Sequence, residues 1–304
     1  MTDNIRDIFE QNIVLLGQTD KAICYFRRQQ HDIALGIIAD AMDLIKHSIE
    51  AIINDREYFN LVSTDSVMEM LSGILDSYKK VDYILLADLL ELQLVNFIIG
   101  VQELIIGKEE ISFDEERYYE NIEFLKDNSS GLEKLLNQPV DPQELLMKGY
   151  RVEFTSCGLM TLVAQNGDAS FYFHTNNRIY AEAFMLAGHW YRKDLKEYII
   201  YGLGFGYHIH ELLNISDQAK ITIYESDLNV IKLASIFTRL KELMKSGGRL
   251  KLVYDPEYQE LKQRIKNKSK EEAFFVHYPS FQNIRNDEGR RLMKNHVSWN
   301  AHEK

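Results

Sequence analysis

The sequence predicts an α/β domain with a parallel, doubly wound sheet, joined to a separate all-α helical bundle. The first half has no proline before Pro139, and its apolar residues recur at helical spacing. The second half alternates short apolar runs with helical segments, an order typical of a parallel sheet. The distribution of charged side chains divides the chain at about the same place as the change in periodicity. Residues 1–150 carry 13 basic and 28 acidic side chains, whereas residues 151–304 carry 22 and 18.

Composition excludes several classes of protein. Of the 304 residues, 45% are apolar and 27% are charged, which excludes a disordered or collagen-like chain. The acidic first half should repel nucleic acid and anionic membranes, whereas the second half could accept an anionic small molecule. Cys24 and Cys157 form no metal-binding set, and the polar N-terminus is not a signal peptide. We therefore expect a cytoplasmic protein that binds neither nucleic acid nor membrane.

The helical bundle is predicted over residues 1–140. The expected helices are Asp20–Asn54, with Asp20 as its cap, one that begins at Thr64-Asp65-Ser66, Val81–Ile106, and one that follows Asp114. Charges within Val81–Ile106 indicate a buried helix of a bundle rather than a membrane span. Pro139 and Pro142 mark the boundary.

We expect no metal site in the bundle. Asp43 and His47 share a helix face with Glu50, but residues 1–150 contain no Glu-x-x-His motif of the kind that carboxylate bundles use. Docking to a partner or self-association is the better prediction for this half.

The α/β domain is predicted over residues 148–304 and begins with a β-meander. The expected meander strands are Arg151–Phe154, Leu159–Ala164 and Ala169–His174, with a hairpin turn at Asn166-Gly167. After a helix at Tyr180–Tyr191, the expected parallel strands are Tyr198–Tyr201, Ile221–Tyr224, Leu250–Tyr254 and Ala273–His277.

A glycine-rich turn carries the functional prediction. Gly202, Gly204 and Gly206 follow a predicted strand and open a helix, where a ligand can approach the backbone and an anion can meet the helix N-terminus. Glu225 ends the next strand, 23 residues after Gly202, and could accept the hydroxyls of a ribose. Tyr207 stands where a dinucleotide fingerprint has its third glycine, which favours an S-adenosylmethionine-type ligand over NAD.

Other candidates lie at the ends of the predicted strands. Asp255 could contact a base, and His277 lies where open sheets bind ligands. His208 could touch a ligand at the helix start, although a half-exposed surface histidine is an equal alternative. His174 and Glu182 could meet above the sheet in a structural hydrogen bond. The candidate ligand-binding residues are Gly202, Gly204, Gly206, Tyr207, His208, Glu225, Asp255 and His277, with no metal ligand among them.

Residues 171–280 resemble the N-terminal Rossmann-like region of the motility accessory factors, a bacterial family of glycosyltransferases that modify flagellin with nonulosonic acids. The resembling stretches are FYFHT at 171–175, Glu182-Ala183, YGLGFGYH at 201–208, IYE at 223–225 and VHYPS at 276–280. Arg178-Ile179 stand where that family has Asp-Pro. The family's second, catalytic domain has a Gly-Pro-Ser-type signature that this chain lacks. The resemblance therefore implies a fold, a pocket and a setting near surface or flagellar glycosylation, without the transferase activity.

The same stretch is similar to class I methyltransferases at their first two motifs. Those enzymes carry an acidic residue two positions before the first glycine, where this chain has Ile200, and they complete a seven-strand sheet. Three functions stay open: an accessory protein that binds a nucleotide- or S-adenosylmethionine-type ligand, an S-adenosylmethionine-dependent methyltransferase, and a structural interaction module without a ligand.

Overall fold

A computed structural model describes residues 2–60, 62–109, 115–132, 142–166, 169–245 and 247–297. The chain divides into a helical unit and an α/β unit. The helical unit comprises Met1–Ser112, Phe154–Leu159 and Asn176–Ala181. The α/β unit comprises Phe113–Glu153, Met160–Thr175 and Glu182–Lys304.

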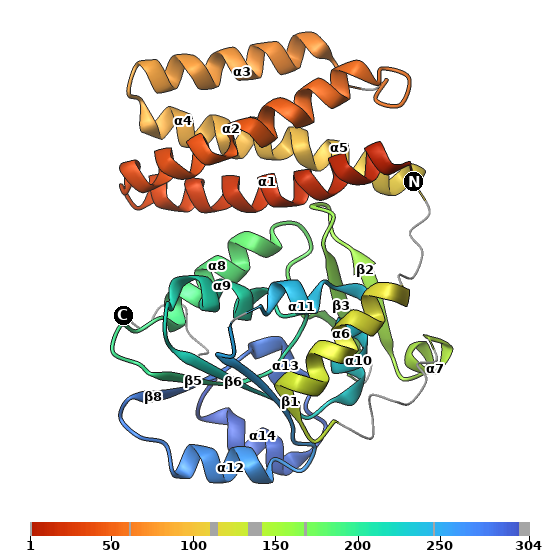
Figure 1. Cartoon of the computed structure of the whole chain (residues 1–304), viewed down its shortest axis with the longest axis vertical. Coiled ribbons are helices and arrows are strands. Elements are labelled where there is room, and N and C mark those ends of the chain that lie inside the picture. The colour runs from red at the N-terminus through yellow and green to blue at the C-terminus, as the bar shows by residue number, and fades with distance from the viewer. Residues whose placement is uncertain are drawn as a thin grey trace. The chain divides into compact units, whose positions relative to one another are not determined.

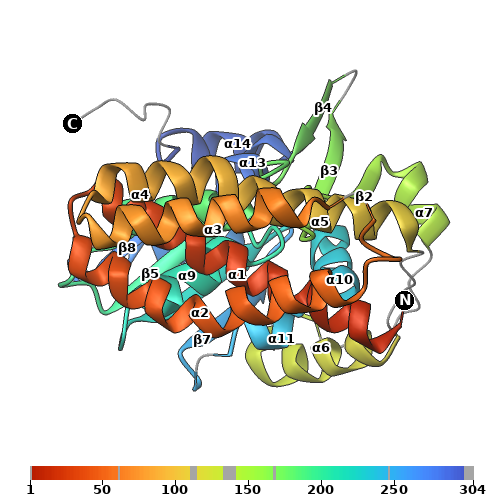
Figure 2. The same cartoon turned by 90° about the horizontal axis from the view of Figure 1, so that it is seen from above.

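The helical unit is a bundle whose helices run side by side (Figures 1 and 2). Its elements are α1 (Asp3–Arg27), α2 (His31–Asn54), α3 (Thr64–Lys79), α4 (Tyr83–Leu89), the π-helical turn η1 (Leu90–Leu94) and α5 (Val95–Lys108). Apolar residues of α1, α2 and α5, among them Ile8, Ile52 and Ile105, form one core cluster. The bundle is thus held by the shared burial of apolar helix faces.

The single helix predicted at Asp20–Asn54 is wrong, because the chain turns between α1 and α2. Gln29 adopts a positive φ of 60° at this break. Asp20 is not a cap but a buried residue within α1. The apolar spacing continues across the turn because both helices bury a face in the same core, so periodicity alone does not reveal the break. The cap of α3 is Ser63, one residue before the predicted Thr64.

The helical run from Tyr83 to Lys108 is long and apolar enough to cross a membrane by length and composition. Within the bundle it supplies core residues, and Leu90, Leu94 and Ile105 are fully buried there. Its buried Gln102 donates hydrogen bonds to the carbonyl oxygens of Phe9 and Cys157. These contacts place one face of the run in the bundle core, whereas Ile84 and Leu92 of the same run are 73% and 65% exposed.

Arg178 explains why the short segment Asn176–Ala181 belongs to the helical unit. Its guanidinium binds the buried carboxylate of Asp20 and lies 2.7 Å from a carboxylate oxygen of Glu91. Arg178 thus takes part in a partly buried ion-pair network.

The α/β unit contains a five-stranded parallel sheet and a three-stranded sheet (Figure 1). Its helices are α6 (Glu115–Asn128), α7 (Pro142–Met147), α8 (Ile179–Trp190), α9 (Tyr207–Ile215), α10 (Leu228–Phe237), α11 (Leu240–Leu243), α12 (Gln259–Lys266), α13 (Tyr278–Gln282) and α14 (Asp287–Lys294). Its strands are β1 (Ser129–Ser130), β2 (Tyr150–Phe154), β3 (Met160–Asn166), β4 (Ala169–Tyr172), β5 (Glu197–Tyr201), β6 (Lys220–Glu225), β7 (Leu250–Tyr254) and β8 (Glu272–Val276). The first residues of α8 and the last residue of β2 fall in segments of the helical unit.

The strand order of the parallel sheet is β1-β7-β6-β5-β8. In register, Tyr201 of β5 lies opposite Tyr224 of β6 and Val276 of β8. The chain moves outward from β5 through β6 to β7 and then crosses back to β8. Helices α9 and α10 lie on one side of this sheet and α12 and α14 on the other (Figure 1). Strand β5 is accordingly buried on both faces from Tyr198 to Tyr201, as its apolar run predicts.

The predicted meander is confirmed as the sheet β2-β3-β4, with β3 and β4 antiparallel. The predicted turn at Asn166-Gly167 includes residue 167, which lies outside the described residues, as does Pro139 of the predicted boundary.

The first segment of the helical unit ends at Ser112 rather than at the predicted residue 140, because α6 packs on the α/β unit. The buried Asn121 of α6 donates hydrogen bonds to the carbonyl oxygens of Ser235 and Thr238, each 2.8 Å long. Its own side-chain oxygen accepts from the backbone N–H of Lys241. The two-residue strand β1 then pairs with β7, and this pairing was missed because Ser129-Ser130 carries no apolar run.

Candidate functional site

The candidate site lies at the carboxyl edge of the parallel sheet, where β5 and β8 are neighbours. The glycine-rich turn follows β5, and His277 follows β8. Because the chain runs from β5 in one direction and returns to β8 on the other side, the strand order reverses between these two strands. In open α/β sheets, ligands bind in the crevice at such a reversal.

The glycine-rich turn is packed against the protein's own side chains. Gly202 and Gly204 have φ values of +106° and +50°. A β carbon on Gly202 would lie 2.4 Å from the Cβ and Oγ of Ser280, and one on Gly204 would lie 2.8 Å from Nε2 of His174. A β carbon on Gly206 would meet the methyl group of Met244 at 2.7 Å. The glycines are therefore required for close packing, whether or not a ligand also approaches them.

Several backbone N–H groups of this turn already have acceptors within the α/β unit. The N–H groups of Gly202, Leu203, Phe205 and Gly206 donate, in that order, to Tyr224 O, Glu225 Oε2, His174 Nε2 and Leu203 O. An anion bound at this turn would have to compete with these bonds.

Glu225 is buried, with 2% of its surface exposed, and its carboxylate joins two loops. One oxygen accepts the N–H of Leu203 at 3.0 Å, and the other accepts the N–H groups of Ser226 and Asp227 at 2.9 and 3.0 Å. Burial raises the pKa of Glu225 to about 7, although the backbone N–H donors act in the opposite direction. A ribose that donated both hydroxyls to this carboxylate would replace at least one of the three bonds, because a carboxylate has about four acceptor positions. Its ribose-binding role therefore stays a prediction.

Asp255 and Tyr207 also make contacts within the protein. The Asp255 carboxylate accepts the backbone N–H groups of Gln259 and Leu261 at the start of α12. The Tyr207 hydroxyl donates to the carbonyl oxygen of Met160 at 2.9 Å. These bonds give both residues a structural role in addition to the ligand-binding role predicted for them.

His208 and His277 are both buried, so the half-exposed alternative for His208 is wrong. Their rings stack with centroids 4.3 Å apart and an angle of 7° between planes. Nε2 of His208 lies 3.2 Å from the carbonyl oxygen of Gly202, and Nδ1 of His277 lies 2.8 Å from Oγ of Ser280. Burial lowers the pKa of His208 to about 3 and that of His277 well below its ordinary value, so both rings are neutral near pH 7.

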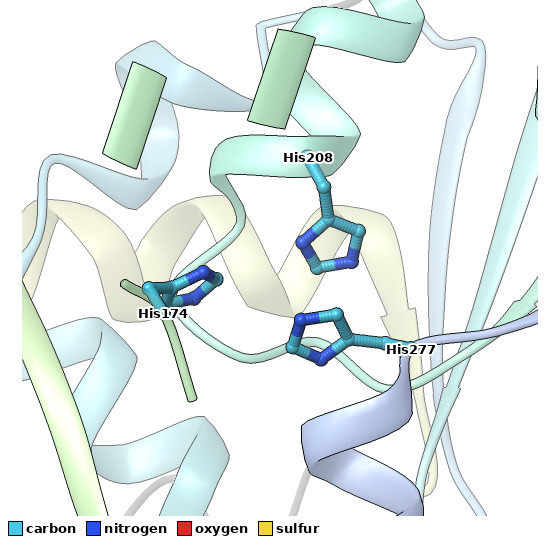
Figure 3. A group of neighbouring side chains, drawn as sticks. All are labelled: His174, His208 and His277. Carbon is cyan, nitrogen blue, oxygen red and sulfur yellow. The ribbon is translucent and has the colours of Figure 1, made fainter. Parts of the chain in front are cut away.

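His174 joins these two histidines, a grouping that the sequence analysis missed. It is buried just beyond β4, and its backbone N–H and C=O both bond to the hydroxyl of Thr161. Its ring centroid is 5.4 Å from that of His277 and 6.0 Å from that of His208. Figure 3 shows the three rings of this histidine cluster gathered around one point. The one available signal was that His174 and His277 each come at the end of a predicted strand.

The predicted meeting of His174 and Glu182 is present as a loose contact. Nδ1 of His174 lies 3.6 Å from one carboxylate oxygen of Glu182, and the other oxygen accepts the N–H of Thr175 at 2.7 Å. Glu182 therefore supports the loop that carries His174.

A cleft of about 390 Å³ opens beside the histidine cluster and is called the β8 cleft here. Its lining residues are Tyr172, Phe173, His174, Thr175, Glu182, Leu186, His189, Trp190, Phe275, Val276, His277, Tyr278, Pro279 and His296. Aromatic walls with a few converging polar groups are typical of a small-molecule site. The cleft could hold a flat ring and bind its polar atoms through imidazole and carboxylate groups.

We expect Gly202→Ala to destabilise the chain by about 3 kcal/mol or more, because the positive φ and the contact with Ser280 both oppose a β carbon. Gly188→Ala is the matched control. Nothing lies within 4 Å of its added β carbon, and alanine is favoured in a helix by roughly 0.5–1 kcal/mol. Urea denaturation measures both changes. A Gly202→Ala protein as stable as the wild type would show that the turn does not depend on this packing.

We expect Glu225 to make the stability of the fold depend on pH. The folded carboxyl holds its proton more tightly than an ordinary glutamate with a pKa of 4.5. Its stabilising contribution is therefore fully present below about pH 4.5 and is lost as the pH rises through 7. The free energy of unfolding of the wild type relative to Glu225→Gln should fall by about 1–3 kcal/mol between pH 5 and 8. Glu242→Gln, at an exposed position, is the matched control. A constant difference across this range would contradict the raised pKa.

Comparisons with protein-family models, with curated proteins and with solved structures found no match to this chain. The resemblances to motility accessory factors and class I methyltransferases therefore stay predictions from the sequence.

Proposed function

We propose that the α/β unit is a Rossmann-like domain that binds a small molecule in the β8 cleft. The observation that carries this proposal is the position of the cleft, which lies beside the reversal of strand order between β5 and β8. With β5 counted as the first strand, β7-β6-β5-β8 has the order third, second, first, fourth. That is the order found on either side of the reversal in Rossmann-type sheets.

The proposed ligand is a nucleotide- or S-adenosylmethionine-type compound. Its heterocyclic ring would lie between aromatic side chains of the cleft such as Trp190 and Tyr278, near the polar atoms of His174 and His277. An accessory role in bacterial surface or flagellar glycosylation, in the cytoplasm, is proposed from the sequence resemblance alone.

The two alternatives differ in what they require of the glycine-rich turn. A methyltransferase would need Glu225 to exchange backbone N–H donors for ribose hydroxyls, and the acceptor would occupy the edge near His277. A structural module without a ligand needs only the observed packing of Gly202 and Gly204. The position of the β8 cleft supports ligand binding over a purely structural module, and the bonds that Glu225 already makes favour a binding protein over a methyltransferase.

Ligand-dependent melting tests this function. We expect one of S-adenosylhomocysteine, CMP, a UDP-sugar or NAD to raise the melting temperature, since a ligand at 100 times its Kd stabilises by about 2.7 kcal/mol. Tyr278→Ala should weaken this effect because Tyr278 lines the cleft with 40% of its surface exposed. Tyr191→Ala, at a similarly exposed position (37%) outside the cleft lining, should leave it unchanged.

The outcomes separate the three functions. A shift with S-adenosylhomocysteine that Glu225→Ala abolishes in a folded protein would favour the methyltransferase. A shift that Tyr278→Ala reduces would support binding in the β8 cleft. No shift in melting temperature with any of the four compounds would favour the third function, a structural module without a ligand.

A second proposal concerns the helical unit. We infer that two copies of the chain associate through exposed apolar side chains of this unit. Exposed large apolar side chains recur on α3, on the turn after it, on α4 and on η1. They are Met68, Leu75, Tyr78, Val81, Ile84, Leu85 and Leu92, of which Ile84 is 73% exposed. A contiguous patch of exposed apolar side chains marks an interaction surface more often than solitary ones do. Most of these side chains lie on α3 and α4, which are in contact.

Light scattering over a range of protein concentrations tests self-association. We expect the wild type to form dimers or larger species and Ile84→Asp to shift the mass towards that of the monomer. Met185→Asp, at an exposed apolar position on α8, is the control and should not change the mass. A wild type that is monomeric at every concentration would overturn this proposal.

A further inference from the structure

The histidine cluster brings together three side chains that are distant in the sequence. His174 follows β4, His208 lies in the first turn of α9, and His277 follows β8. One ring nitrogen from each residue lies within 4.8 Å of one from each of the others. All three residues are buried, so the cluster is part of the interior rather than a solvated surface group.

A hydrogen bond fixes where the His208 ring carries its lone pair, and a second bond occupies one nitrogen of His277. A carbonyl oxygen can only accept, so the bond between Gly202 O and Nε2 of His208 places the proton on Nε2. Nδ1 of His208 is then a bare acceptor, and it is buried without a hydrogen-bond partner. In His277, Nδ1 bonds to the hydroxyl of Ser280, which leaves Nε2 as the other ring nitrogen.

We propose that His174, His208 and His277 bind a transition-metal ion of the zinc class. Neutral imidazole nitrogens suit zinc, copper, iron and nickel, and metal-bound histidines usually bond through their second nitrogen to a protein group that fixes the ring. The Gly202 carbonyl and the Ser280 hydroxyl occupy these supporting positions for His208 and His277. A bound ion would also satisfy Nδ1 of His208, which is otherwise an unpaired buried polar atom.

Metal binding requires the stacked rings of His208 and His277 to rotate, because a metal ion lies near the plane of each imidazole that binds it and these two planes are nearly parallel. Zinc–nitrogen bonds of about 2.0–2.1 Å hold two tetrahedral ligands roughly 3.3 Å apart. From separations of up to 4.8 Å, each pair of nitrogens has to approach by at most about 1.5 Å. Three protein ligands leave one position of a tetrahedral ion open. Because His174 and His277 also line the β8 cleft, water or a ligand atom could reach that position.

His174 is the ligand whose present bonds must change. Its Nε2 accepts the N–H of Phe205, and its Nδ1 lies 3.6 Å from Glu182. Binding through Nε2 would displace the Phe205 N–H. Binding through Nδ1 as a neutral imidazole would move the ring proton to Nε2, which would also break the bond from the Phe205 N–H. We therefore expect His208 and His277 to contribute more to affinity than His174.

Metal analysis of the full chain, without any added small molecule, tests this site independently of the proposed function. After incubation with zinc chloride and desalting, we expect a single retained zinc ion per chain and a higher melting temperature, with no such shift from Mg²⁺. His208→Ala should weaken zinc binding by at least about 100-fold, and Ser280→Ala by about 10–100-fold. His210→Ala is the matched control on the same helix, and its zinc affinity should equal that of the wild type.

Two results would overturn the site. The wild type could retain no zinc, which would mean that the three histidines are only a packed core cluster. Alternatively, zinc could bind equally well to His208→Ala and Ser280→Ala, which would place the ion at other histidines. Should His208→Ala fail to fold, the conservative Ser280→Ala variant and the zinc retention of the wild type still decide the question.

Discussion

The structure of the α/β unit depends on a turn that has no room for β carbons. At Gly202 and Gly204 the backbone has positive φ values, and the space beside it is filled by Ser280, His277 and His174. The absence of two side chains lets β5 and β8 bring their following segments into contact. The crevice expected at this reversal of strand order is consequently occupied in part by imidazole rings, and its open portion lies on the β8 side.

Polar groups on the two sides of this turn have different roles. On the β6 side, Glu225 accepts three backbone N–H groups, and near the end of β7 Asp255 accepts two more. Their carboxylates are used to hold loops and a helix start. On the β8 side, Nδ1 of His208 has no partner and the cleft is lined by aromatic rings, so capacity for binding is concentrated there. Both proposals for the α/β unit rest on this asymmetry.

The predicted elements that fail share a physical reason. The turn at Gln29 interrupts a helical period that continues on both sides, since α1 and α2 bury their faces in one core. The position of α6 in the chain and its acidic composition predict that it belongs to the bundle. The buried hydrogen bonds of Asn121 instead attach α6 to α10 and α11. Strand β1 consists of two serines and is defined only by its pairing with β7. In each case the deciding contact joins residues that local patterns cannot connect.

Local patterns in the amino-acid sequence are enough to predict the helical first half, the β-meander and the parallel strands from β5 to β8. Apolar periodicity and turn residues are local properties, and they are strong in these segments. The sequence also predicts the turn at Gly202–Gly206 and the position of His277 at a strand end. The three-dimensional structure was needed to show that His174 lies beside His208 and His277, that Glu225 is buried, and that the cleft lies next to β8. Those facts depend on strand order and on the crossing from β7 to β8, which bring together residues more than 100 positions apart.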